Sequence, residues 1–98
     1  MSLQMVRFRT NSDTAAEVRS QLAKVFAALQ TASPQGVLYT AYSSKSGTDF
    51  ILALEMEEAQ ANPLLTLPQA AELRELISRA AGAPVPPEPF VVVGSYNP

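Results

Sequence analysis

The sequence predicts one α+β domain, with two helices inserted among four strands in the order β-α-β-β-α-β. Two stretches, residues 13–30 and 67–81, repeat apolar side chains at the spacing of an amphipathic helix. Four shorter stretches are rich in β-branched and aromatic residues or alternate apolar with polar ones, as strands do. The 98 residues are 47% hydrophobic and suffice for one core, so we expect residues 1–98 to form a single domain.

The first strand is predicted over residues 3–10. Val6 and Phe8 alternate there with Arg7 and Arg9, which is the pattern of a half-buried strand. The two arginines should therefore point away from the face of the sheet that the helices cover.

The first helix is predicted over residues 13–30. Thr14 and Glu17 form a capping box at its start. The helix should end before Pro34, because proline disfavours helical backbone in the residue that precedes it. Its apolar stripe consists of Val18, Leu22, Val25, Phe26 and Leu29.

A hairpin of two strands follows, at residues 37–43 and 50–57. The first of these is rich in β-branched and aromatic residues, and the second alternates apolar side chains on one face with a mixed set on the other. The turn between them, residues 44–49, contains Gly47, which can take a positive φ.

The second helix is predicted over residues 67–81. Thr66 and Gln69 form a second capping box, and Pro68 lies in the first turn, where a helix loses no hydrogen bond to it. Gly82 is well placed to end the helix in a left-handed conformation.

The last strand is predicted over residues 90–96, after an extended, proline-rich connector at residues 83–89. The resulting order is the ferredoxin-like arrangement, with the first and third strands central, the other two at the edges, and both helices on one face. The opposite face then has no cover, and the fourth strand is an edge with four consecutive apolar residues, 90–93. We therefore expect a homodimer that closes sheet against sheet.

Composition excludes several classes of function. Without cysteine or histidine the chain lacks thiol nucleophiles and the commonest metal ligands, so we expect no metal site and no cofactor. A net charge of −2 with scattered cations argues against a nucleic-acid partner, and no apolar stretch is long enough to span a membrane. These features are typical of a cytoplasmic protein. Residues 1–3 are interpreted as a possible cloning remnant, with Met5 as the natural start.

In the order of its elements the chain resembles the dimeric α/β-barrel superfamily, most closely its antibiotic-biosynthesis-monooxygenase branch. The shared features are the opening strand MVRFRT, the entry Pro34-Gln35-Gly36 to the hairpin, the acidic segment at 55–58 and the Pro68-Gln69 opening of the second helix. The resemblance implies a barrel made by two facing sheets, with a pocket between sheet and helices in each subunit. It also implies a cofactor-independent monooxygenase acting on a phenolic, quinol or polyketide-type molecule.

The chain departs from that family at two places. Met56 stands where members often carry tryptophan, and residues 59–65 lack the histidine that members often have there. The alternative is therefore a non-catalytic dimeric module, which either binds a small aromatic or apolar molecule or is a structural module whose pocket is filled by its own side chains. A pocket smaller than roughly 300 Å³ would favour the alternative, because it could not hold a polyketide-sized ligand.

Two residues are candidates for catalysis. Glu55 could accept a proton from a phenol or quinol, and Arg7 could stabilise the resulting oxyanion. The structural alternative is an ion pair between Glu55 and Arg7 or Arg9, because the first and third strands should be neighbours. We favour that ion pair, since an unpaired buried carboxylate is costly.

Five further residues are candidates for ligand binding. A guanidinium, three phenols and an amide could each hydrogen-bond a small aromatic molecule. They are Arg9, Tyr39, Tyr42, Asn62 and Tyr96.

Overall fold

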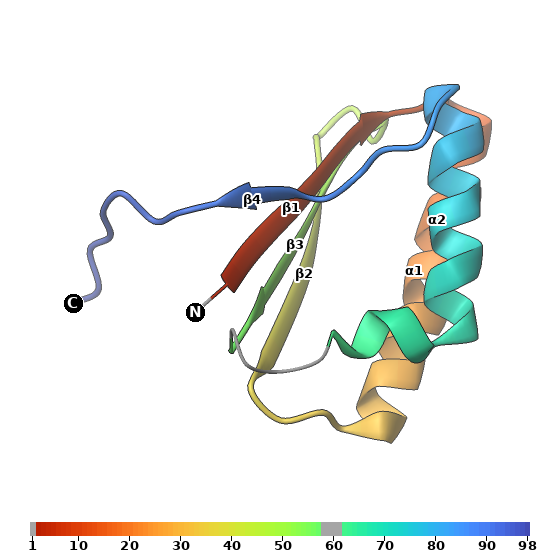
Figure 1. The fold of residues 1–98 in the computed structure, drawn as a ribbon. Helices are drawn as coiled ribbons and strands as arrows, with labels where there is room; N and C mark the ends of the chain where they lie inside the picture. The colour runs from red at the N-terminus through yellow and green to blue at the C-terminus, as the bar shows by residue number, and fades with distance from the viewer. Residues whose placement is uncertain (1, 58–61) are drawn as a thin grey trace.

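The computed structural model describes residues 2–57 and 62–98, and Figure 1 shows them as one sheet beside two helices. The elements are β1 (Ser2–Arg9), α1 (Ser12–Ala32), β2 (Val37–Ser43), β3 (Asp49–Met56), the 3₁₀ helix η1 (Pro63–Thr66), α2 (Pro68–Ala81) and β4 (Glu88–Phe90).

The sheet has the order β2-β3-β1-β4, and each neighbouring pair is antiparallel. Both helices lie on the same side of it (Figure 1). The predicted ferredoxin-like α+β fold is therefore confirmed. We call the side of the sheet that faces away from the helices the open face.

The core lies between the helices and the covered face of the sheet. Val18 and Val25 of α1 are fully buried, and the rings of Phe8 and Phe50 stack with their centroids 5.3 Å apart. These two rings come from neighbouring strands, since Phe8 pairs directly with Phe50 in the register of β1 and β3. The other buried members of this cluster are Ala15, Leu22, Leu52, Leu73, Leu76 and Ile77.

The helix starts differ from both predicted capping boxes. The side chain of Asn11 caps α1, where its oxygen accepts a hydrogen bond of 2.9 Å from the amide of Thr14. The cap of α2 is Leu67, whose apolar side chain cannot make a capping bond. The hydroxyl of Thr66, which the predicted capping box required, donates instead to the carbonyl of Pro63 within η1. The predicted helix ends are confirmed, since α1 stops before Pro34 and Gly82 has a φ of +80°.

The fourth strand is shorter than predicted. It starts at Glu88 and stops at Phe90, whereas the sequence pattern indicated residues 90–96. Its partner limits it within the described residues, since Phe90 pairs with Leu3 of β1 and only Ser2 lies beyond Leu3 in the described part of that strand. Residues 91–98 consequently find no strand to pair with in the described part of their own chain.

Candidate functional site

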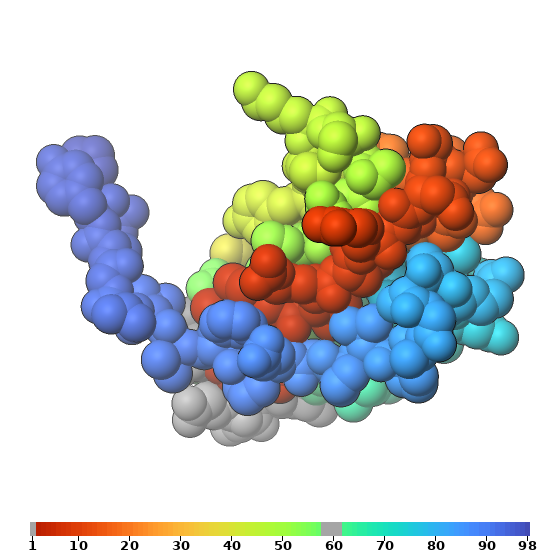
Figure 2. Space-filling view, turned by 90° about the horizontal axis from the view of Figure 1, so that it is seen from above, coloured from red at the N-terminus to blue at the C-terminus, as the bar shows by residue number. Residues whose placement is uncertain are grey.

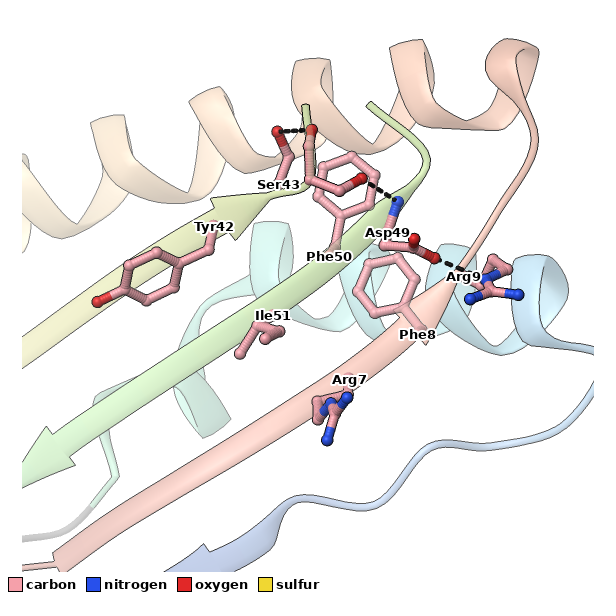
Figure 3. A pocket seen from close by; sticks show the side chains of 9 residues that line it. Arg7, Phe8, Arg9, Tyr42, Ser43, Asp49, Phe50 and Ile51 are labelled. Atoms are coloured by element: carbon pink, nitrogen blue, oxygen red, sulfur yellow. Dashed lines mark hydrogen bonds and ion pairs between the residues drawn. The ribbon is translucent and has the colours of Figure 1, made fainter. Parts of the chain in front are cut away.

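The clearest candidate site lies on the open face, at the end of the sheet where β2 turns into β3. There the register places Arg7 of β1 beside Ile51 of β3, and Ile51 beside Tyr42 of β2. Figure 3 shows these three side chains in one row across the three strands. The open face thus presents a guanidinium, an aliphatic side chain and a phenol side by side.

This row lines a groove of about 610 Å³, within the range of about 300–1,000 Å³ that is typical of small-molecule sites. We call it the open-face groove. It brings together three of the seven residues singled out from the sequence. Its lining residues are Arg7, Phe8, Arg9, Tyr42, Ser43, Ser44, Asp49, Phe50 and Ile51.

The two arginines of the groove differ in their availability. Nε of Arg9 donates to Oδ1 of Asp49 at 2.7 Å, and this hydrogen bond raises the pKa of Arg9. Within the described residues no hydrogen bond or ion pair engages Arg7, whose side chain is exposed. Arg7 is therefore the cation of the groove that is available to an anion.

The rim of the groove is held by the turn between β2 and β3. The hydroxyl of Ser44 accepts a hydrogen bond from the amide of Asp49 at 3.2 Å, and Gly47 has a φ of +85°. From α1, Arg19 donates to the carbonyl of Gly47 at 3.2 Å and places its guanidinium 5.3 Å from the ring centre of Phe50. This positive φ favours glycine at position 47, whereas a Cβ there would lie 3.0 Å from Nη2 of Arg19, the tip of a flexible side chain that can shift slightly.

Glu55 does not form the ion pair that we favoured from the sequence, and that prediction is wrong. Its cross-strand neighbour on β1 is Leu3, while Arg7 is four residues further along the strand and Arg9 is bound to Asp49. Glu55, Arg7 and Arg9 all lie on the open face, because strand side chains alternate between the two faces. The register of β1 and β3 decides how far apart on that face they lie. At about 3.3 Å per residue, Glu55 and Arg7 are roughly 13 Å apart along the strands.

Glu55 instead lies between two leucines, Leu3 on β1 and Leu38 on β2. Together they line a smaller hollow of about 150 Å³ on the open face. The remaining residues around this hollow are Met5, Thr40, Tyr42 and Ala53. A carboxylate is thus placed in a largely apolar part of the open face.

A third pocket lies on the helix side of the sheet and has a volume of about 110 Å³. This is below the roughly 300 Å³ needed for a polyketide-sized ligand and comparable with a single aromatic ring. Tyr39 and Asn62 line it together with Arg74 of α2. Burial raises the pKa of Tyr39 to about 12, although the nearby charge of Arg74 opposes the shift.

The side chain of Asn62 also has a structural role, whereas Tyr96 lies away from these pockets. Oδ1 of Asn62 accepts a hydrogen bond of 2.9 Å from the amide of Leu64 and so caps η1. Tyr96 is 86% exposed and lines none of the three hollows described above.

Sequence reasoning missed three residues of these sites: Ile51, Asp49 and Arg74. Ile51 and Asp49 share the parity of Glu55 along β3, and that parity was the available signal for the open face. No comparable signal pointed to Arg74, because its position over the sheet depends on how α2 packs.

Across residues 2–57 and 62–98, no group of three or more acidic side chains lies close enough to hold a metal ion. None of the helices in the same residues is long and apolar enough to cross a membrane. Comparisons with protein-family models, curated proteins and solved structures found no significant match. The likeness to the dimeric α/β-barrel superfamily therefore rests on element order and on the short motifs quoted from the sequence.

Proposed function

We propose that the protein is a homodimer that binds a small anionic aromatic molecule in the open-face groove and does not transform it. The observation that carries this proposal is the row of Arg7, Ile51 and Tyr42 in a groove of about 610 Å³. It is the non-catalytic alternative that the sequence already indicated.

The three side chains match the chemistry of such a ligand. Arg7 offers a planar fork of donors to a carboxylate or phenolate, and Ile51 offers an apolar surface to a ring. Tyr42 is 55% exposed and can stack on the ring or hydrogen-bond a polar substituent. Arg7 and Tyr42 are two strands apart, about 10 Å, which suits an aromatic acid of one or two rings.

A second copy on the open face would give the ligand a drier site. The exposed apolar side chains beyond the groove include Leu38, which is 58% exposed. Exposed apolar surface of this kind is typical of an interface, and the resemblance to the dimeric α/β barrels supports the same assembly.

The resemblance also supports an oxygenase with Glu55 as base and Arg7 as oxyanion partner. Both groups must reach adjacent atoms of one substrate for that reaction. Their separation of roughly 13 Å along the sheet argues against this within one subunit, and the pocket of about 110 Å³ is too small for a polyketide. We therefore favour binding without turnover.

Titration of the protein with 1-hydroxy-2-naphthoate, followed by calorimetry, tests the proposal. Arg7→Met should weaken binding by roughly 10- to 150-fold, the usual value of a hydrogen bond to a charged group. Arg79→Met, which removes an exposed arginine from α2, is the matched control and should bind like the wild type. The neutral analogue 2-naphthalenemethanol should not distinguish Arg7→Met from the wild type.

Two results would overturn the proposal. One is equal affinity of the wild type and Arg7→Met for the naphthoate, or no binding at millimolar concentration. The other is oxygen consumption with a dihydroxynaphthalene that Glu55→Gln abolishes, because that result would establish the oxygenase instead.

A further inference from the structure

The chain ends in an arm, residues 91–98, that stands apart from the body of the protein. Figure 1 shows it leaving β4 on the side of the sheet away from the helices, and Figure 2 shows it projecting from the body in a perpendicular view. A Cβ on Gly94 would meet no other atom within 4 Å. The arm therefore extends on the same side as the open face.

The arm carries several exposed apolar side chains. Val91, Val93 and Tyr96 are 82%, 96% and 86% exposed, and Val92 is 65% exposed. Phe90 and the three valines make four consecutive apolar residues, a composition that is unusual for a segment left in water. Burying two such side chains per arm is enough to change a dissociation constant by about a hundredfold or more.

The arm continues from β4 but pairs with no strand among the described residues. Its backbone continues β4, which pairs with β1 only as far as Leu3 and Phe90, next to the end of β1. At about 3.3 Å per residue the eight residues of the arm reach roughly 26 Å. A second sheet stacked on the open face would lie about 10 Å away and is therefore within reach.

We infer that residues 91–98 form an exchanged arm, which crosses to a second copy of this chain and packs on the open sheet face of that copy. This inference rests on the homodimer of the proposed function. A second copy is the occupant that the observations favour, because arm and open face lie on the same side of each subunit. In a dimer with a two-fold axis, each arm would then pack on the other subunit through the same set of contacts.

Sedimentation of the full chain and of a chain ending at Phe90 tests this inference. The full chain should be a dimer at micromolar concentration, and the shortened chain should dissociate about a hundredfold more readily. Val92→Lys should have the same direction of effect. Far-ultraviolet circular dichroism should show that the shortened chain keeps its fold, because Val85, which packs on the core, is retained.

The absence of cysteine permits a direct test of the contact. A chain with Val92→Cys is mixed with a chain with Thr40→Cys, which lies in the middle row of the open face. Mild oxidation should then form a disulfide between the two chains. The same Val92→Cys chain mixed with Ser20→Cys, on the exposed side of α1, is the matched control and should not cross-link.

The outcomes separate this inference from the homodimer. A full chain that stays monomeric near 100 μM overturns the homodimer itself (about −5.5 kcal/mol of association or weaker). A dimer that is equally stable without the arm, and gives no cross-link between positions 92 and 40, overturns the exchanged arm alone. A monomeric chain carrying both cysteines that closes an internal disulfide would show that the arm folds back on its own sheet, which also overturns the inference.

Discussion

Tyr39 is a phenol that the fold places among apolar side chains on the helix side of the sheet. Its ring lies 5.5 Å from that of Phe26, at an angle of 42°, and it lines the pocket of about 110 Å³ beside Arg74. Burial penalises the phenolate, and the pKa of Tyr39 rises from 10.0 to about 12 as a result. This single residue makes the stability of the fold depend on pH in the alkaline range.

The direction of that dependence follows from the two pKa values. Below pH 10 both states keep the proton, so the free energy of unfolding does not respond to Tyr39. Between pH 10 and 12 the unfolded chain releases the proton while the folded chain keeps it. Stability should therefore fall as pH rises through this window, by up to about 1.4 kcal/mol per pH unit.

Urea unfolding at pH values from 8 to 11.5 would measure this slope, because the series covers about 1.5 pH units of the window above pH 10. Tyr39→Phe should remove it, whereas Tyr42→Phe, on the open face, should leave it in place. An unchanged slope in Tyr39→Phe would assign the alkaline loss of stability to other groups.

At the scale of single elements, α1 is capped by Asn11 and not by the predicted capping box of Thr14 and Glu17. Asn11, Asp13 and Thr14 are all common at helix starts, and Thr14 with Glu17 has the spacing of a capping box. The chain leaves β1 at Arg9 and reaches α1 at Ser12, so Asn11 is the residue that has extended backbone at the junction. Its side chain then reaches the amide of Thr14, three positions on.

Asn11→Ala should therefore destabilise the protein by about 1 kcal/mol, within the range of about 0.5–2 kcal/mol known for helix caps. Thr14→Ala is the control, and it should have the smaller effect because Thr14 contributes only its backbone amide to the cap. Thermal unfolding of both variants measures the difference. A larger loss in Thr14→Ala would mean that the capping box, rather than Asn11, stabilises the start of α1.

At the scale of the whole molecule, the sheet is a single layer with one covered face and unequal edges. β3 and β1 have neighbours on both sides, while β4 has only three residues of pairing. β3 also buries Phe50, Leu52 and Leu54 under the helices. The centre of the sheet should thus open last when the protein fluctuates.

Native-state hydrogen exchange measures this order. The amides of β3 and β1 that bond to one another should exchange only on global unfolding, and those of β4 should exchange at least about 100 times faster. This difference in exchange rates is expected for the monomer in dilute solution, where residues 91–98 do not contact a second copy. Protection of β4 equal to that of β3 would show that the C-terminal edge is paired beyond Phe90.

The sequence by itself determined the fold class, the number of strands and α-helices, and most of their ends. These depend on local properties: the periods of 3.6 and 2 in apolar residues, the proline at the start of α2, and the glycine that ends it. Parity along the strands also indicated that Arg7, Arg9 and Glu55 lie on the face away from the helices, which the register of β1 and β3 bears out. Each of these properties is set within a few residues of chain.

Only the tertiary structure decided which of those residues meet. Parity fixes the face, but strand register fixes the neighbour, and register depends on how two distant segments align. It brought Arg7 beside Ile51 and left Glu55 beside Leu3, so the pair expected from sequence did not form. It also ended the pairing of β4 at Phe90, which lies opposite Leu3 near the described start of β1. A strand's length is set by its partner as much as by its own residues, and that partner is not written in the local sequence.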